Sequence, residues 1–125
     1  LAPTELTIAD GSGLSTLNRV SAESLNKILM HMAKRPDLSI DYLSSMAVSG
    51  VDGTLSKRLK EPDTKRMIRA KTGYIDGVSA LSGYIYTNNN DTLVFSIIMN
   101  NFPNVFTARS VQDQICKELV HYGEK

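Results

Sequence analysis

The chain has 125 residues, of which 42% are hydrophobic and 22% charged, a composition typical of a single globular core. Its 14 basic and 13 acidic residues leave a net charge of +1, which gives no electrostatic footprint for nucleic acid or an anionic membrane. No apolar run reaches the roughly 18 residues that a membrane-spanning helix requires. The chain opens at Leu1 without a Met or a charged leader, which indicates a mature, cleaved or truncated chain.

The first half of the chain predicts a short strand, one clear helix and a turn-rich segment. Residues 5–9 predict the strand, which runs into a turn at residues 10–13 (DGSG). Ser21 is a favourable N-cap for a helix that Pro36 ends, with Val20 packing on Leu25 as a hydrophobic staple. The helix spacing predicts one buried face, made of Leu25, Ile28, Leu29 and Met32. Residues 41–46 predict one or two further helical turns, residues 50–55 a turn and residues 56–65 a charged surface segment.

The second half predicts a three-stranded antiparallel meander followed by a helix. Residues 66–72 and 79–87 predict two strands, with Gly73 ending the first and a turn at Asp76-Gly77. Residues 92–99 are almost continuously apolar, as in a central strand covered on both faces. A helix from about Thr107 closes the chain, and its predicted buried face is Val111, Ile115, Leu119 and Tyr122. This order of elements predicts an α/β (α+β) domain in which helices flank an antiparallel sheet.

The triplet Lys71-Thr72-Gly73 is the strongest chemical signal, although a Lys-Thr-Gly triplet alone also fits a strand end with a turn glycine. A lysine ammonium and a threonine hydroxyl can hold a substrate carboxylate and tune a nearby serine. Gly73 lets a peptide backbone come close to the strand edge. The same triplet occurs beside S-x-x-K and S-x-N elements in serine penicillin-binding enzymes.

Two further blocks make the pattern specific. Residues 10–20 (DGSGLSTLNRV) resemble the block that carries the second motif of class C low-molecular-mass penicillin-binding proteins. Residues 50–55 (GVDGTL) are similar to another block of that family, and the Lys-Thr-Gly triplet follows in the same order. The resemblance implies a penicillin-binding or serine β-lactamase-like fold, with a C-terminal helix packed on the sheet. It implies a D-Ala-D-Ala carboxypeptidase or endopeptidase of the cell wall, with a β-lactamase as a sister interpretation.

The resemblance also implies roles for individual residues. Ser15 would be the serine of the second motif and would pass a proton to the leaving amine. Lys71 and Thr72, with Gly73, would bind the terminal carboxylate of a D-Ala-D-Ala stem peptide or of a β-lactam. The family motif has asparagine two residues after its serine, whereas here Leu17 holds that place and Asn18 follows it. Asn18 is therefore assigned to the catalytic set with a shift of one position.

The nucleophile of this family lies in an S-x-x-K element, and the chain has one match at Ser24 and Lys27. Thirteen serines and eight lysines in a chain of this length predict about one such match by chance. The match also follows the second motif, whereas the family places its nucleophile well before it. We therefore interpret Ser24 and Lys27 as solvent-facing residues of an amphipathic helix. The chain is then the C-terminal portion, residues 1–125, of a transpeptidase-like domain whose nucleophile lies elsewhere.

The remaining candidates indicate no cofactor or metal. His31 and His121 have no Cys or carboxylate at metal-ligand spacing, and Cys116 is interpreted as a small core residue of a helix. The resemblance implies three partners, which are the stem peptide, β-lactams and the N-terminal part of the same protein. It also implies a location in the periplasm or cell envelope. Exposed apolar surface of a partial sheet also predicts self-association. The alternative is a non-catalytic domain of the same fold that holds peptidoglycan or a partner protein.

Overall fold

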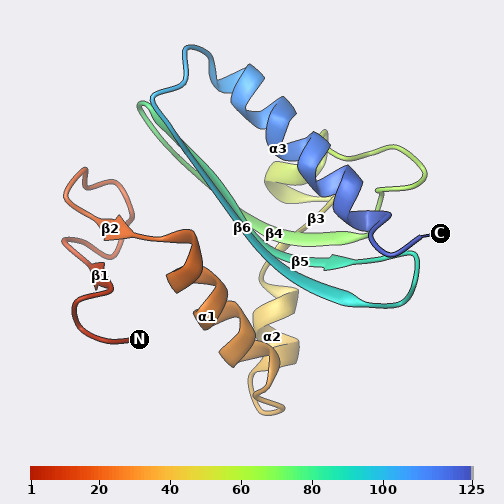
Figure 1. The fold of residues 1–125 in the computed structure, drawn as a ribbon, viewed down its shortest axis with the longest axis horizontal. Coiled ribbons are helices and arrows are strands. Elements are labelled where there is room, and N and C mark those ends of the chain that lie inside the picture. Colours follow the sequence, from red (N-terminus) through yellow and green to blue (C-terminus); the bar gives the residue numbers. More distant parts are fainter. Residues whose placement is uncertain (125) are drawn as a thin grey trace.

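The computed structural model describes residues 1–124 and has a four-stranded antiparallel sheet at its centre. The strand order is β3 (Ala47–Val48), β4 (Ile68–Ile75), β5 (Val78–Tyr86) and β6 (Thr92–Asn100). The helix α1 (Ala22–Ala33) packs on β5 and β6 from one side, and α3 (Val105–Val120) packs on the same strands from the other (Figure 1). The predicted α+β architecture, with a C-terminal helix on the sheet, is confirmed.

The main core lies between the sheet and α3. Because side chains alternate along a strand, every second residue of β4, β5 and β6 faces α3. The short 3₁₀ helix η1 (Gly53–Leu55) adds Leu55 to this core. Cys116 is fully buried here, as predicted, and burial raises the pKa of its thiol to about 12. The other buried members of this core are Leu59, Ile68, Ala70, Leu81, Ile85, Phe95 and Val120.

A smaller core lies on the opposite face of the sheet, under α1 and α2 (Ser39–Ser44). It is built from Leu29, Met46 and Tyr84. The Tyr84 hydroxyl donates to the backbone oxygen of Leu29 at 2.6 Å, and burial raises the pKa of Tyr84 to about 12. The predicted N-cap of α1 is confirmed, because Ser21 Oγ accepts from the backbone N–H of Ser24 at 3.0 Å. Of the predicted buried face, Leu29 is buried, whereas Ile28 is 38% exposed.

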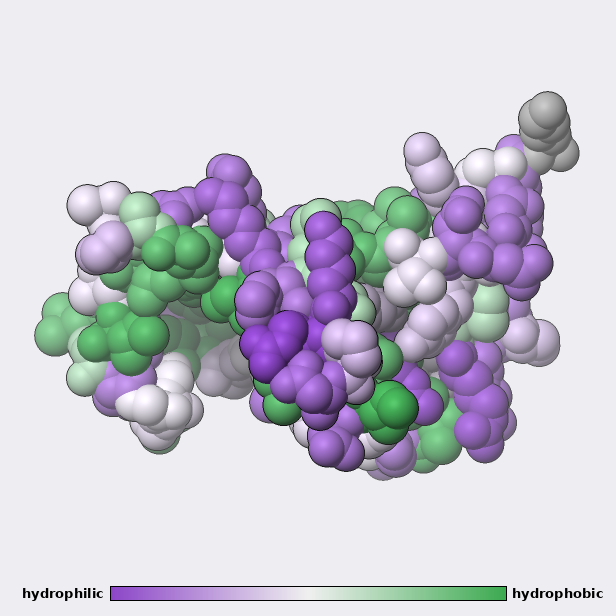
Figure 2. Space-filling model, turned by 90° about the horizontal axis from the view of Figure 1, so that it is seen from below, coloured by the Kyte–Doolittle hydropathy of each residue, from purple (hydrophilic) through white to green (hydrophobic). Residues whose placement is uncertain are grey.

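The N-terminal segment forms a small lobe beside the sheet. In it β1 (Leu6–Thr7) pairs antiparallel with β2 (Arg19–Val20), and the chain between them makes a loop. Figure 2 shows hydrophobic surface gathered at the left of the view, over this segment. The exposed apolar side chains of the lobe are Ile8, Leu14, Leu17 and Val20. Val20, predicted to pack as a staple, is 45% exposed.

Two strand predictions require correction. The strand β4 does not end before Gly73 but continues to Ile75, because all eight of its residues pair with β5. The predicted turn lies only at Asp76-Gly77, where Gly77 has φ +75°. The strand β3 was not predicted, because two residues carry too little sequence pattern. As predicted, both faces of β6 are covered, one by α1 and the other by α3, and among residues 1–124 this strand pairs with β5 alone.

The buried face of α3 was predicted incorrectly except at Leu119, which is partly buried and packs against the main core. Val111, Ile115 and Tyr122 are 43%, 40% and 59% exposed. The helix instead buries Ala108, Gln112, Cys116 and Val120, one residue further round. Gln112 is fully buried because its Nε2 donates to Ser79 Oγ at 3.1 Å, and a polar residue at a core position misleads a pattern based on hydrophobicity.

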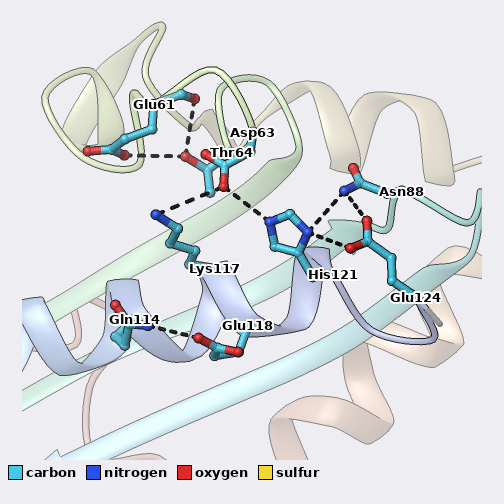
Figure 3. Close-up of polar contacts among 9 residues, drawn as sticks. All are labelled: Glu61, Asp63, Thr64, Asn88, Gln114, Lys117, Glu118, His121 and Glu124. Carbon is cyan, nitrogen blue, oxygen red and sulfur yellow. Dashed lines mark hydrogen bonds and ion pairs between the residues drawn. The ribbon is translucent and has the colours of Figure 1, made fainter.

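Polar contacts fix the C-terminal end of α3 (Figure 3). His121 Nε2 lies 3.1 Å from Asp63 Oδ2, and His121 Nδ1 lies 2.9 Å from Glu124 Oε2. Asn88, in the turn between β5 and β6, also contacts His121 and Glu124. Hydrogen bonds to two carboxylates raise the pKa of His121, and the bond to Asp63 has a larger effect than the bond to Glu124. No helix among residues 1–124 has the length and apolar character needed to cross a membrane.

Candidate active site

The strand β4 presents the Lys-Thr-Gly triplet in its interior, beside a free edge. Ile68 O accepts from Ser49 N on the β3 side, whereas Met67 O accepts from Tyr86 N on the β5 side. Because backbone groups alternate in direction along a strand, those of Thr72 and Tyr74 point away from β5. The partner β3 pairs only with residues 69 and 70 of β4. The backbone of residues 72–74 therefore forms an edge open to another extended chain.

The side chains of Lys71 and Thr72 lie on opposite faces of β4, because consecutive strand residues alternate. Lys71 is exposed, and its ammonium donates to the Thr72 backbone oxygen at 2.7 Å. Lys71 makes no ion pair with any of residues 1–124. The Thr72 hydroxyl donates to Thr54 Oγ1 at 3.0 Å, which ties β4 to η1. The Lys71 ammonium thus lies at the free edge without a carboxylate partner.

A row of polar residues crosses the sheet at Lys71. Ser82 of β5 lies directly opposite Lys71, and Ser96 of β6 lies opposite Ser82. The hydroxyls of Ser82 and Ser96 are buried, and neither has a hydrogen-bond partner among the described residues. Ser82 was not among the residues predicted from the sequence. Ser82 could have been predicted from the hairpin turn at Asp76-Gly77, because this turn fixes the strand register that pairs residue 71 with residue 82.

A hollow of about 270 Å³ lies over this row, between the sheet and the two helices α1 and α2. Its polar end is formed by Lys71, Thr72 and Ser82. Its apolar walls are formed by Leu25, Ile28, Leu29, Tyr42, Met46 and Ala80. The low dielectric constant of an apolar wall strengthens the attraction between the Lys71 ammonium and an anion that enters the hollow.

The loop that carries Ser15 and Asn18 is held by its own side chains. Asn18 Oδ1 accepts from Ala9 N at 2.7 Å and from Asp10 N at 3.3 Å, and Asn18 Nδ2 donates to Asp10 Oδ1 at 2.7 Å. Hydrogen bonds from Ser12 and then Asn18 lower the pKa of Asp10. Ser15 Oγ accepts from Leu17 N at 3.1 Å. The Asn18 carboxamide is therefore engaged in shaping the loop.

A second hollow, of about 600 Å³, joins this loop to β4. Ser15 and Asn18 line it on one side, and Gly73 and Tyr74 line it on the other. The two hollows share Leu25, Gly73 and Ala80. The structure thus brings the first and third sequence blocks together around Gly73, with Ser15 and Lys71 in adjoining hollows.

The internal S-x-x-K match has a structural role, but not the one predicted. Ser24 is only 1% exposed, so it does not face the solvent. Its hydroxyl donates to Glu5 O at 3.3 Å and lies 2.9 Å from Ser21 Oγ. Lys27 forms ion pairs with Glu5 and Glu23. This pair fastens the N-terminal lobe to α1, and it lines neither hollow at the Lys-Thr-Gly triplet.

Sequence comparison decides the family. The model of the D-Ala-D-Ala carboxypeptidase 3 (S13) family matches residues 1–122. The chain belongs to this family. Within residues 1–124, no group of three or more His, Cys, Asp or Glu side chains is placed to hold a metal ion.

Similar S13 proteins are much longer than this chain. The penicillin-sensitive carboxypeptidase A of Dictyostelium discoideum is 38% identical over 81% of this chain, and the match spans 21% of that protein. The D-alanyl-D-alanine carboxypeptidase of Actinomadura sp. is 36% identical over 94% of this chain, which spans 22% of that protein. The crystal structure of penicillin-binding protein 4 from Haemophilus influenzae, complexed with a β-lactam, has a TM-score of 0.86 and 27% identity. That match covers 95% of this chain and 29% of the other. The chain spans about a fifth of the curated relatives it matches.

Proposed function

We propose that this chain is the C-terminal portion of a serine-type D-Ala-D-Ala carboxypeptidase or endopeptidase of the periplasm or cell envelope. The observation that supports it best is the free edge of β4 at residues 72–74, beside which the Lys71 ammonium has no carboxylate partner among residues 1–124. In this proposal the portion of the enzyme that carries the S-x-x-K nucleophile lies outside these 125 residues. The share of the S13 relatives that the chain spans supports this division.

The substrate would bind as an additional strand. An extended stem peptide that ends in D-Ala-D-Ala would hydrogen-bond to the backbone of Thr72 and Tyr74. Gly73 leaves space for it on the face that Lys71 shares. The Lys71 ammonium would exchange its bond to the Thr72 oxygen for a stronger bond to the terminal carboxylate. A β-lactam carries a carboxylate at the corresponding place and would use the same contact.

The reaction would be acyl transfer through serine. The serine Oγ of the S-x-x-K element attacks the carbonyl of the D-Ala-D-Ala bond, and its proton passes to the leaving amine of D-alanine. Water then hydrolyses the acyl-enzyme and restores the serine. The Lys71 ammonium would hold the terminal carboxylate so that the scissile carbonyl stays aligned with the nucleophile.

Ser15 and Asn18 would act from the loop of the N-terminal lobe. We assign to Ser15 the transfer of the proton to the leaving amine, supported by its place in the hollow that adjoins Lys71. Asn18 would support Ser15, and its three bonds to Ala9 and Asp10 favour a positioning role.

The test is acylation of the gene product that contains this chain by penicillin, followed by peptide mass mapping. We expect an adduct on a serine outside residues 1–125. In Lys71→Gln we expect the acylation rate to fall by about 100-fold, because a charge-assisted bond to the carboxylate is lost. The matched control is Lys34→Gln, which removes the same charge at the exposed C-cap of α1.

Each outcome discriminates between the interpretations. An adduct on Ser24 would contradict the rejection of the internal S-x-x-K element. If the folded protein forms no adduct, the proposed enzymatic function is refuted and a non-catalytic domain that holds peptidoglycan is favoured. An unchanged acylation rate in Lys71→Gln would refute the role of the β4 edge.

A further inference from the structure

A groove of about 660 Å³, separate from the two hollows at β4, lies between the segment that follows η1 and the outer side of α3. One wall is formed by residue 54 and residues 57–61. The other wall is formed by α3, from residues 106, 109, 110, 113, 114 and 117, which recur at helical spacing. Figure 3 shows Lys117 extending from α3 toward the segment that carries Glu61 and Asp63.

The floor of this groove is a closed ion pair. Arg58 Nη2 lies 2.6 Å from Asp113 Oδ1, and the two side chains are only 14% and 27% exposed. The same guanidinium donates to Gln112 Oε1 at 3.1 Å and to Arg109 O at 3.4 Å. The floor charges therefore neutralise each other, and the rim sets the electrostatic character of the groove.

The rim is cationic. Lys57, Lys60 and Arg109 make no ion pair with any of residues 1–124, and Lys117 lies 3.9 Å from Asp63. Across its lining the groove has five cationic and two acidic side chains, whereas the whole chain is almost balanced at +1. The positive charge is thus concentrated here, where it attracts an anionic ligand.

The groove continues from the free edge of β4. Thr54 lines the groove and also accepts the hydrogen bond of Thr72. Arg109 lines the groove as well, and its guanidinium carbon lies 5.5 Å from the centre of the Tyr74 ring. Thr72 and Tyr74 are the two residues whose backbone groups face the open edge. A peptide that pairs with this edge therefore leaves it beside the cationic rim.

We propose that this groove is a subsite for the acidic part of a peptide whose extended part pairs with β4. The occupant is an acidic peptide and not a phosphate polymer, because a strand edge selects a peptide backbone. This inference rests on the proposed function, in that the peptide at the edge is the substrate. It adds specificity beyond the terminal carboxylate, since Lys57, Lys60 and Arg109 would bind carboxylates distant from the scissile bond.

The experiment is isothermal titration calorimetry on the gene product that contains this chain, with hexaglutamate as the probe. Hexaglutamine is the neutral probe of equal length, and inorganic pyrophosphate represents a phosphate polymer. We expect hexaglutamate to bind at least about tenfold more tightly than the other two, and to bind more weakly as salt is added. Lys57→Gln combined with Lys60→Gln should weaken hexaglutamate binding by about three- to tenfold. Lys34→Gln combined with Lys65→Gln, which removes equal charge from residues that do not line the groove, should leave binding unchanged.

Penicillin acylation, measured on the same variants, separates this inference from the proposed function. Acylation at the wild-type rate with weakened hexaglutamate binding in the groove variant would support the subsite. If hexaglutamate binding requires Lys57 and Lys60 but penicillin does not acylate the protein, the proposed enzymatic function is refuted and the acidic-peptide site is supported. Equal binding of hexaglutamate and hexaglutamine, tighter binding of pyrophosphate, or equal loss in the control variant would overturn the proposal.

Discussion

The substitution Gly83→Ala tests how closely β4 and β5 approach beside the candidate site. Gly83 lies directly opposite Ala70, one position from Lys71. A methyl group at residue 83 would lie 2.1 Å from Arg69 O and 2.9 Å from Ala70 Cβ. Directly opposed β-carbons usually lie about 4.5–5.5 Å apart, so the shortfall is about 2 Å. The obstructing atoms belong to the backbone and to a methyl group, so no side-chain rotation can relieve the overlap.

We therefore expect Gly83→Ala to destabilise the protein by about 3 kcal/mol or more, since overpacking that displaces backbone lies at the upper end of its usual range. Because the domain that contains this chain is longer than 125 residues, that loss lowers its melting temperature by about 6 °C or more. The measurement is a thermal melt of the gene product that contains the chain, followed by circular dichroism. A melting temperature within about 2 °C of the wild type would refute the reasoning.

The matched control is the same change at Gly73 in the neighbouring strand. There the added methyl group would lie 3.5 Å from Ala80 Cβ, which is an ordinary contact. We expect Gly73→Ala to melt within about 2 °C of the wild type. Penicillin acylation should nevertheless fall by about tenfold, because the methyl group would occupy the junction of the two hollows. The pair thus separates a glycine required for folding from one required for ligand approach.

Three further predictions concern His121 near the C-terminus and the loop of the N-terminal lobe. Because Asp63 and Glu124 raise the pKa of His121, its stabilising contribution is complete below its unfolded value of about 6.5 and is lost as the pH rises through the folded value. The melting temperature should therefore fall between about pH 6 and pH 8 in the wild type but not in His121→Gln, and equal pH profiles would contradict this. Ser15→Ala should slow penicillin acylation by about 100-fold with an unchanged melt, and a loss below about threefold would remove the proton-transfer role. Asn18→Ala should instead cost about 1–2 kcal/mol in a urea titration, because it removes three hydrogen bonds of the loop.

Local signals in the sequence predicted most of the elements. Ser21 and Pro36 bracket α1 because capping and the loss of a backbone donor act within one helical turn. The Asp76-Gly77 pair located the hairpin because only a few residue types, Gly above all, readily adopt the positive φ that such a turn needs. The buried face of α3 was missed because Gln112 is buried through a bond to Ser79, which is distant in sequence.

The sequence by itself determined the family blocks, the meander and the residues with the right chemistry, because these depend on residue identity and short-range spacing. Only the tertiary structure decided that β4 continues past Gly73 and that its edge is open beyond residue 70. It also decided that Lys71 and Thr72 face opposite sides of the strand and that Ser82 lies beside Lys71. These features depend on strand register and on where a neighbouring strand stops, which are set by contacts between segments far apart along the chain.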